Sequence, residues 1–294
     1  MNGILPLWKP KGLTSHDCVI KIRKLFQTKK VGHTGTLDPE VEGVLPICIG
    51  QATKIVPYLT DSTKVYIAEM KLGSSTDTED AQGKILEKKE VDQLPSNKEI
   101  HNVLKRFTGQ IEQVPPMYSA VRVNGKKLYE YARANESVER PKREVTIHDL
   151  QFIGVNQNAI KLKITCSKGT YIRTLCVDIG KELGYPAHMS ELVRIETGTF
   201  KEESTVTFQQ IEDKVKQNKQ NDLLLPIISG LSHLDTYSVD EETSKKVLFG
   251  QKFTKPMIKL KTNPFVILYQ EEILAIYQDH PTKEDQIKPV RVFN

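Results

Sequence analysis

The sequence predicts an α+β fold with a largely antiparallel sheet. Residues 64 to 72 and 159 to 166 alternate apolar and polar side chains, which is the period of a strand with one buried face. Helical and strand segments follow each other irregularly, without the repeating strand–helix–strand order of a parallel sheet. With 294 residues, 38% of them hydrophobic, the chain can bury a core in one large domain or in two smaller ones.

The first predicted elements are a helix and a buried strand. Ser15 is expected to cap a helix that extends to about Phe26. Residues 43 to 49 are a short apolar run that ends at Gly50, which is typical of a buried strand. The alternating strand at residues 64 to 72 follows.

The middle of the chain adds two helices around a polar stretch. Ser96 and Glu99 form a capping box, which predicts a helix that Gly109 ends. Residues 117 to 145 are polar, basic and weakly periodic, which predicts a mobile excursion. After the strand at 159 to 166, a second helix is expected over residues 170 to 183.

The last part of the sequence predicts a small separate unit. Residues 215 to 222 are polar and turn-like, as expected of a linker. Beyond residue 235 we expect a helix over 241 to 248 and a hairpin formed by the apolar runs 265 to 270 and 273 to 278.

The charge and the cysteine content indicate which cellular compartment and which kind of binding partner to expect. The net charge is +5 and the pI about 8.8, a weak indication of an anionic partner. Six basic side chains fall between Lys126 and Arg143. The four cysteines contain no C-x-x-C pair, which indicates buried thiols in a reducing compartment, the cytoplasm. The sequence shows no secretory signal and no apolar run long enough to span a membrane.

The sequence lacks the motifs of several common kinds of catalytic and binding site. It contains no phosphate-binding loop, no dinucleotide fingerprint, no H-E-x-x-H and no G-x-S-x-G. Residues 77 to 83, DTEDAQG, resemble a calcium loop only faintly, because Ala81 stands at a ligand position and the glycine comes one place late. We therefore predict a solvated turn there, and neither a metal nor a cofactor.

The remaining candidate is Asp38 in the segment GHTGTLDP. As a turn residue it needs no function, since Asp-Pro favours turns. As a nucleophile or base, a carboxylate must stay ionised in a desolvated site, which requires a cation beside it. Arg173, at the start of the predicted second helix, is the candidate cation, although it is equally compatible with a surface arginine.

Several segments together resemble the TruB family of tRNA pseudouridine synthases, which isomerise the uridine at position 55 in the T loop of tRNA. The resemblance departs from the family pattern after Asp-Pro, where this chain carries Glu40 and Glu42 in place of small residues. The matching segments, in chain order, are WKPKGLTS (8–15), GHTGTLDP (32–39), KVY (64–66), PPMYSAVRVNGKKLYEYAR (115–133), KGTYIR (168–173) and HMSELVRIETGTF (188–200).

The resemblance implies a pseudouridine synthase fold: a central mixed, largely antiparallel sheet flanked by helices, with a small C-terminal β-rich PUA-like module. It places a catalytic domain at residues 1 to 232 and the RNA-binding module at 233 to 294. Within the first, residues 117 to 145 become a mobile RNA-binding loop. The implied activity is that of an isomerase without a cofactor or a metal.

The resemblance also assigns the catalytic residues. Asp38 attacks or deprotonates the substrate, Arg173 pairs with it and keeps it charged, and Tyr66 stacks on the extruded uracil and serves in proton transfer. Attack at the sugar C1′, attack at C6 of the base, and a glycal route that starts with deprotonation all stay open.

Other residues are implied to bind the substrate. Each has a simpler alternative: Tyr66 and Leu192 as ordinary core residues, His33 as a turn residue, and Lys9 as a brace of the catalytic loop. The basic cluster, which includes Arg143, is implied to clamp the RNA backbone. The expected substrate-binding residues are Lys9, His33, Tyr66, Arg143, Tyr171 and Leu192.

The expected partner is the T stem-loop of tRNA, bound by a cytoplasmic monomer without a membrane or an obligate protein partner. Three rival functions remain at this point. The first is a pseudouridine synthase that depends on a guide RNA, the second an RNA-binding or tRNA-folding protein without catalysis, and the third a hydrolase with an aspartate nucleophile.

Overall fold

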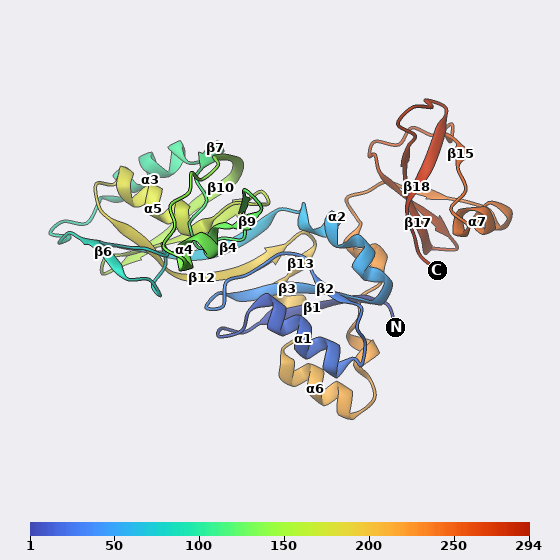
Figure 1. Ribbon diagram of the computed structural model, residues 1–294, viewed down its shortest axis with the longest axis horizontal. Coiled ribbons are helices and arrows are strands. Elements are labelled where there is room, and N and C mark those ends of the chain that lie inside the picture. The colour runs from blue at the N-terminus through green and yellow to red at the C-terminus, as the bar shows by residue number, and fades with distance from the viewer. The chain divides into compact units, whose positions relative to one another are not determined.

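The computed structural model describes residues 1 to 294, which form two compact units. Unit 1 comprises residues 1–39, 44–60 and 198–294, and unit 2 comprises residues 40–43 and 61–197. In Figure 1 the blue and the orange to red segments belong to unit 1, and the cyan to yellow segments belong to unit 2. Unit 1 is therefore assembled from the two ends of the chain, and unit 2 from its middle.

Unit 2 is built on one mixed sheet. Its neighbouring strands are antiparallel, except that residues 42 and 43 of β3 pair in parallel with β12. The predicted α+β class with a largely antiparallel sheet is therefore confirmed. The strands, in order across the sheet, are the first two residues of β3 (Glu42–Ile49), β12 (Ala187–Thr197), β4 (Lys64–Leu72), β11 (Ala159–Cys166), β10 (Arg143–Asn156) and β7 (Gly109–Gln113).

The two alternating segments form strands with the predicted bounds, β4 and β11. They pair with each other over their whole length, so that Ala68 lies opposite Leu162 and Met70 opposite Ile160. All four of these side chains are fully buried. The alternation therefore reports a real difference between the two faces of the sheet.

Two helices of unit 2 differ slightly from their predicted bounds. The capping box of Ser96 and Glu99 opens α3 (Asn97–Arg106), as predicted, but the helix ends at Arg106, and Gly109 instead begins β7 with a φ of 100°. The next helix, α5 (Ile172–Glu182), begins two residues later than predicted, with Tyr171 as its N-cap.

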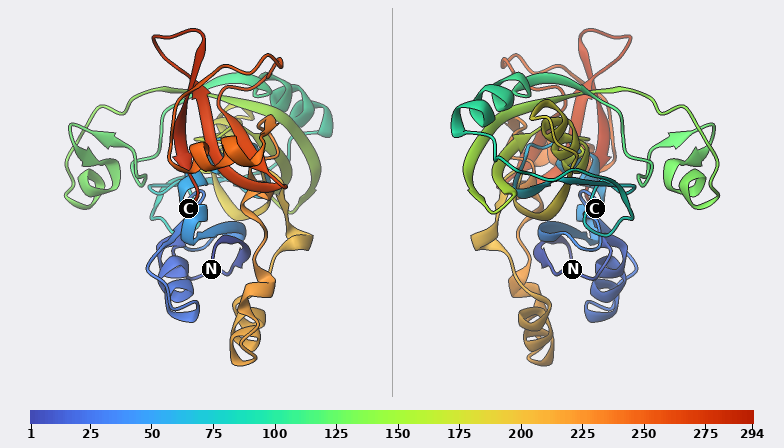
Figure 2. Two further views of the ribbon diagram at one scale, coloured as in Figure 1. Left: turned by 90° about the vertical axis from the view of Figure 1, so that its right-hand side faces the viewer. Right: turned by 90° about the vertical axis from the view of Figure 1, so that its left-hand side faces the viewer.

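The stretch 117 to 145, predicted to lack regular structure, contains a small hairpin and a helix. These are β8 (Arg122–Val123), β9 (Lys126–Lys127) and α4 (Leu128–Arg133), which stand away from the sheet of unit 2 in Figure 2. Arg143, expected in the loop, is the first residue of β10 and lies opposite Gln113. These elements were not predicted because each is too short for a hydrophobic period to repeat within it.

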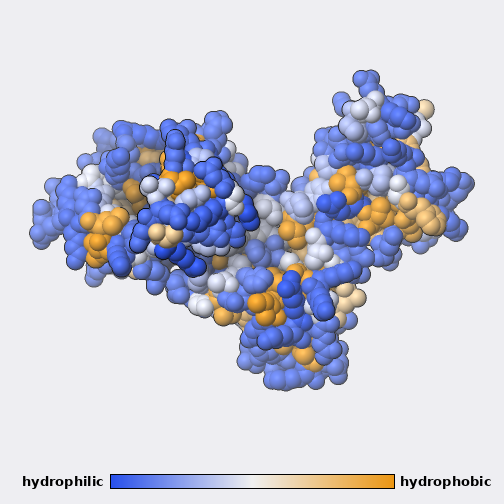
Figure 3. Space-filling model, in the orientation of Figure 1, coloured by the Kyte–Doolittle hydropathy of each residue, from blue (hydrophilic) through white to orange (hydrophobic).

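A second hairpin of unit 2 carries an exposed apolar surface. It joins β5 (Ser74–Thr76) to β6 (Ile85–Lys88). Ile85 and Leu86 are 54% and 70% exposed, and a patch of apolar residues lies over β6 in Figure 3. An isolated bridge between Asp80 and Met189 connects the turn between β5 and β6 to β12.

Unit 1 begins with β1 (Gly3–Lys9), which lies next to β3, while β2 (Val31–His33) pairs with residues 47 to 49 of β3. Helix α1 (Ser15–Leu25) is capped by Thr14, whose side chain accepts the N–H of Asp17. The predicted cap, Ser15, is instead the first helical residue. Both residue types are favourable caps, and their adjacency in the sequence left the position of the cap open by one residue.

The C-terminal half of unit 1 contains the predicted hairpin and helix inside a five-stranded sheet. The predicted linker at 215 to 222 is instead the end of α6 and a 3₁₀ turn. The elements are α6 (Phe208–Lys216), α7 (Glu241–Leu248), β14 (Thr236–Ser238), β15 (Phe253–Thr254), β16 (Phe265–Tyr269), β17 (Glu272–Asp279) and β18 (Gln286–Val292). Shorter elements of unit 1 are α2 (Val56–Thr60), β13 (Phe200–Lys201) and the 3₁₀ turns Gly50–Ile55, Glu202–Ser204, Gln220–Leu223 and Ile227–Gly230.

The C-terminal sheet shares a hydrophobic cluster with the N-terminal segments of unit 1. Val266 and Ile276, both fully buried, pack in one cluster with Ile4 and Ile55. The Lys54 ammonium donates to the Val292 carbonyl at 2.6 Å. The sheet also has a separate cluster of its own around Tyr277.

Two further findings concern the environment of the chain. All four cysteines are buried, as predicted, and burial raises the pKa of the Cys48 thiol to about 12. None of the helices combines the length and the apolar character needed to cross a membrane.

Candidate active site

In unit 1, Asp38 lies in the turn between β2 and β3, and the residue before it is fixed by Ser15. The buried Ser15 hydroxyl accepts the N–H of Leu37 at 2.9 Å and donates to the carbonyl of Leu37 at 3.2 Å. One side chain thereby satisfies both backbone groups of a buried residue that has no partner in a helix or a sheet. This anchor holds the chain immediately before Asp38.

The residue after Asp38 is fixed by Lys9. The Lys9 side chain is fully buried, and its ammonium donates to the carbonyls of Pro39 at 3.0 Å and Pro10 at 2.9 Å. The N–H of Gly12 donates to the same Pro39 carbonyl at 2.9 Å. The Lys9 ammonium thus joins the segment after β1 to the residue that follows Asp38.

We predict that Ser15→Ala destabilises the protein by about 1–3 kcal/mol, because it leaves the buried N–H of Leu37 without this partner. Urea unfolding measures the difference. Ser204→Ala, which removes an exposed hydroxyl, is the matched control and should change the free energy of unfolding by less than about 0.5 kcal/mol. Equal effects of the two changes would contradict the anchoring role of Ser15.

In unit 2, Tyr66, Leu192 and Arg194 share one face of the sheet. Tyr66 on β4 lies opposite Arg194 on β12, and Leu192 lies opposite Ala68, two residues further along β4. The exposed fractions are 8% for Tyr66, 7% for Leu192 and 2% for Arg194. An aromatic ring and a leucine on one face, with a buried guanidinium beside them, provide an apolar surface suited to a planar ring.

This face depends on a close approach of two strands at Gly43. Gly43 pairs with Arg194, and a Cβ atom on it would lie 2.2 Å from the Arg194 carbonyl oxygen. Its φ is 128°, a conformation that side chains rarely adopt. Glycine is therefore required here for β3 to reach β12.

Arg173, in the first turn of α5, is held by two backbone carbonyls. Its two terminal nitrogens donate to Thr78 and to Tyr118, each at 3.0 Å, and its exposed fraction is 6%. These carbonyls come from the β5–β6 turn and from the segment after β7. A guanidinium directed by two fixed acceptors is preorganised, because its planar fork loses little freedom on binding a further partner.

The backbone of Tyr171, the N-cap of α5, is held by the side chain of Gln113. The Gln113 side chain accepts the N–H of Tyr171 at 3.0 Å and donates to its carbonyl at 3.1 Å. Gln113 is 2% exposed. Both ends of the short segment from Tyr171 to Arg173 are thus anchored on side chains or carbonyls of other elements.

A buried lysine adds positive charge to this part of unit 2. Lys64 begins β4, two residues before Tyr66, and donates to the Ser62 carbonyl. Burial and then the Arg194 guanidinium lower the pKa of Lys64 to about 8. Since both cations are buried on the sheet, their field favours an anionic group nearby.

The structure thus groups the predicted residues by unit. Unit 1 carries Lys9, Asp38 and His33, whose Nδ1 accepts the N–H of Gly35 at 3.3 Å. Unit 2 carries the remaining predicted residues: Tyr66, Tyr171, Arg173 and Leu192, and also Arg143, exposed at the start of β10.

Sequence reasoning missed three supporting positions. Gln113 carried no signal because a lone glutamine after a strand is unremarkable. Ser15 was assigned to a cap that Thr14 provides. The segment 77 to 83 was predicted to be a solvated turn, but its Thr78 carbonyl holds Arg173.

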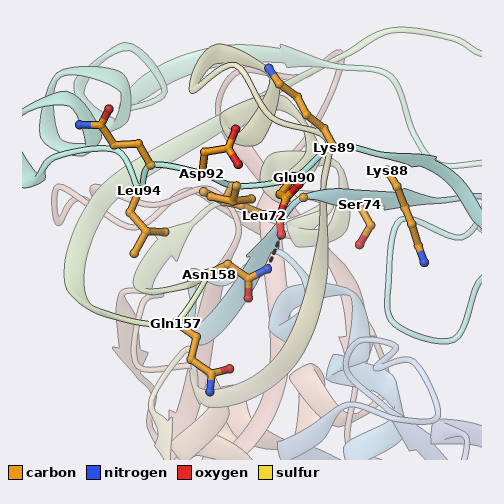
Figure 4. A pocket seen from close by; sticks show the side chains of 12 residues that line it. Leu72, Ser74, Lys88, Lys89, Glu90, Asp92, Leu94, Gln157 and Asn158 are labelled. Atoms are coloured by element: carbon orange, nitrogen blue, oxygen red, sulfur yellow. Dashed lines mark hydrogen bonds between the residues drawn. The ribbon is translucent and has the colours of Figure 1, made fainter.

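A pocket of about 730 Å³ lies at the far end of β4 from Tyr66, beside Leu72 and Gly73. In Figure 4 the Asn158 side chain reaches the Leu72 carbonyl across one wall, at 2.7 Å. None of the predicted site residues lines this pocket. It is therefore separate from the face that carries Tyr66 and Leu192.

Comparison with known proteins identifies the family. The model of the TruB family pseudouridylate synthase N-terminal domain matches residues 23–172, and that of the tRNA pseudouridylate synthase B C-terminal domain matches residues 173–234. The tRNA pseudouridine synthase B of Oceanobacillus iheyensis is 64% identical over 296 residues, covering 100% of this chain and 98% of the relative. That of Listeria innocua is 52% identical over 300 residues, covering 99% and 98%.

Solved structures agree with the fold. A crystal structure of a Cbf5–Nop10–Gar1 complex matches with a TM-score of 0.78 at 28% identity, covering 99% of this chain and 84% of that one. An H/ACA ribonucleoprotein bound to a substrate RNA containing 2′-deoxyuridine matches with a TM-score of 0.76 at 27% identity, covering 99% and 85%. On this evidence, the chain belongs to the TruB family of pseudouridylate synthases.

Proposed function

We propose that this chain converts the uridine at position 55 in the T loop of tRNA to pseudouridine. The observation that carries the proposal is the 64% identity, over the whole chain, to a tRNA pseudouridine synthase B. Three of the proposed catalytic residues also have defined structural support: Asp38 through the anchors of its two neighbours, Tyr66 through its pairing with Arg194, and Arg173 through the carbonyls of Thr78 and Tyr118.

In the proposed reaction the N1–C1′ bond of the uridine breaks, the uracil turns, and a C5–C1′ bond forms. The proton leaves C5 and N1 gains one, so the product is an isomer of the substrate. Asp38 is the nucleophile or base, and Arg173 keeps it ionised. Because Ser15 and Lys9 fix both neighbours of Asp38, the carboxylate meets the substrate with little freedom left to lose.

The target base has to leave its loop before it reacts. Extruding a nucleotide costs a few kcal/mol, and stacking on an aromatic ring returns about 1–3 kcal/mol. We propose that Tyr66 provides this ring, that Tyr171 and Leu192 line the uracil pocket, and that His33 fills the space vacated in the loop. The shared face of Tyr66 and Leu192 supports this assignment.

The basic hairpin and helix after β7 are proposed to bind the RNA backbone. Lys126 lies over the ring of Tyr131 at 4.6 Å, and Lys127 and Arg133 both lie 5.3 Å from the ring of Tyr129. The three cations, of which Lys126 also pairs with Glu136 at 2.7 Å, are thus grouped on a small element that stands away from the sheet of unit 2. Arg143, exposed at the start of β10, is proposed to extend the same basic surface.

A triple change of Lys126, Lys127 and Arg133 to Ala should weaken T-arm RNA binding and reduce its dependence on salt. Each lost phosphate contact lowers the slope of log K against log salt by about 0.7–0.9. Filter binding at several salt concentrations measures the slope. Lys98→Ala with Lys105→Ala, both exposed on α3, is the control and should leave it unchanged. An unchanged slope in the triple variant would remove these residues from the RNA interface.

The proposed enzyme acts alone on tRNA, as a monomer in the cytoplasm. The 64% identity to a named tRNA enzyme, against 28% to Cbf5 in its complex, favours this over dependence on a guide RNA. Residues 233 to 294 are proposed to form a PUA-like RNA-binding module, consistent with a five-stranded sheet that has its own core.

The test is to treat unmodified tRNA transcripts with the purified protein and to map pseudouridine. We expect one modified site, in the T loop, on full tRNA and on an isolated T arm. Binding without product would support an RNA-folding protein, and a released base would support a hydrolase. Activity only after addition of a guide RNA and partner proteins would contradict the stand-alone enzyme.

A further inference from the structure

The turn between β5 and β6 contacts the start of α5 at two consecutive residues. The Thr78 carbonyl accepts a hydrogen bond from Arg173 at 3.0 Å, and the Glu79 carboxyl accepts one from the Thr174 hydroxyl at 2.6 Å. Thr174 is 6% exposed. Neighbouring residues of the turn therefore hold neighbouring residues of the helix.

The turn between β5 and β6 is fixed by hydrogen bonds among its own residues and by one to β12. Asp80 accepts hydrogen bonds from the Thr78 hydroxyl at 2.6 Å and from the N–H of Gln82 at 2.9 Å. The Glu79 carbonyl accepts the N–H of Met189 on β12 at 3.0 Å. Glu79 adopts a φ of 64°, an uncommon backbone conformation for a glutamate.

Charges of both signs surround the Glu79 carboxyl. Burial raises its pKa, while the Thr174 hydrogen bond, Arg173 and Arg140 act in the opposite direction and Asp178 raises it further. Since burial penalises the ionised form, this penalty is present above the folded-state pKa and is relieved below it. A neutral side chain of the same shape should therefore not destabilise the fold.

We infer that Glu79 is a positioning residue whose carboxylate fixes the first turn of α5, and with it the guanidinium of Arg173, in the geometry that the reaction needs. The inference rests on the proposed function. The Glu79 carboxylate also lies beside the first turn of α5, through its contact with Thr174, and the helix dipole favours a negative charge there. Glu79 and Thr78 act together: Thr78 accepts a hydrogen bond from the Arg173 side chain, and Glu79 accepts one from the side chain of the next residue, Thr174.

Glu79→Gln and Thr174→Val test this inference separately. The first keeps the shape and removes the charge, and the second keeps the shape and removes the hydrogen-bond donor. We expect each to lower the single-turnover rate of pseudouridine formation about 10- to 100-fold, since small displacements of catalytic groups have effects of this size. Affinity for T-arm RNA should stay within about twofold, and Thr174→Ser should restore the wild-type rate.

The melting temperature separates positioning from simple support of the fold. Glu79→Gln should melt at or above the wild-type temperature despite its lower rate. Glu87→Gln, a change of an exposed residue on β6, is the control. It should alter neither the melting temperature nor the single-turnover rate. Rates of both test variants within about twofold of wild type would overturn the inference, and so would a rate loss that follows a lowered melting temperature.

A measurement that does not depend on turnover distinguishes failure of the positioning role of Glu79 from failure of the proposed function. Hydrogen exchange of the Arg173 guanidinium, followed by ¹⁵N NMR, should be faster by about tenfold in Glu79→Gln, because a looser clamp opens more often. If wild-type protein makes no pseudouridine but this exchange difference is found, the proposed function fails and the positioning role stands. Unchanged exchange overturns the positioning role whatever the wild-type activity.

Discussion

Asp38→Asn is expected to abolish pseudouridine formation while RNA binding is retained. Asparagine keeps the size and turn preference of aspartate but is neither a nucleophile nor a base, so we expect the single-turnover rate to fall at least about 10⁴-fold. The anchors on Leu37 and Pro39 do not involve the carboxylate and should persist. Quantitative mapping of pseudouridine in T-arm RNA, together with a binding titration, measures both properties.

Glu40→Gln is the matched control for Asp38→Asn. Glu40 is an exposed carboxylate two residues further along the chain, so its neutralisation removes the same charge without touching the proposed chemistry. We expect its rate to stay within about threefold of wild type. Substantial product from Asp38→Asn would remove the aspartate from the mechanism, and loss of RNA binding in that variant would give Asp38 a structural role.

Arg173→Lys is expected to lower the rate about 10²- to 10³-fold and to destabilise the protein by about 1–3 kcal/mol. A lysine keeps the charge but has no fork, so it cannot donate to the carbonyls of Thr78 and Tyr118 at once in the observed geometry. One of the two part-buried carbonyls is left without this partner, and the charge is no longer directed. Single-turnover kinetics and urea unfolding measure the two effects.

Arg106→Lys controls for the substitution type. Arg106 is exposed on α3 and pairs with Glu182 at 2.9 Å, an interaction that a lysine can replace. Rate and stability should both stay close to wild type. If Arg173→Lys behaved in the same way, the two-carbonyl clamp would have no part in activity.

The sequence predicted the regular elements that have a strong period. Strands β4 and β11 have the predicted bounds because one face of each is buried against the core and the other is not. Helix α7 also has its predicted bounds, because an aspartate cap and a following glycine limit it at both ends. The class of fold follows from these segments and from their irregular order.

The contacts that support the candidate site could not be predicted, because they join residues far apart in the chain. Ser15 reaches Leu37, Gln113 reaches Tyr171, and Glu79 reaches Thr174, each through a side chain whose sequence neighbours give no hint of its partner. The turn 77 to 83 illustrates the difficulty. Polar residues that satisfy each other and a buried helix look, in sequence, like polar residues that face water.

The order of assembly during translation follows from the way unit 1 is divided. Strand β1 leaves the ribosome first and its neighbour β3 follows soon after, but its other backbone partners, Val206 and Leu225, are synthesised some two hundred residues later. The continuous segment 61 to 197, by contrast, holds most of unit 2 and is complete before those partners exist. One side of β1 therefore stays without its later backbone partners until those residues have been synthesised, so completion of unit 1 depends on the last third of the chain.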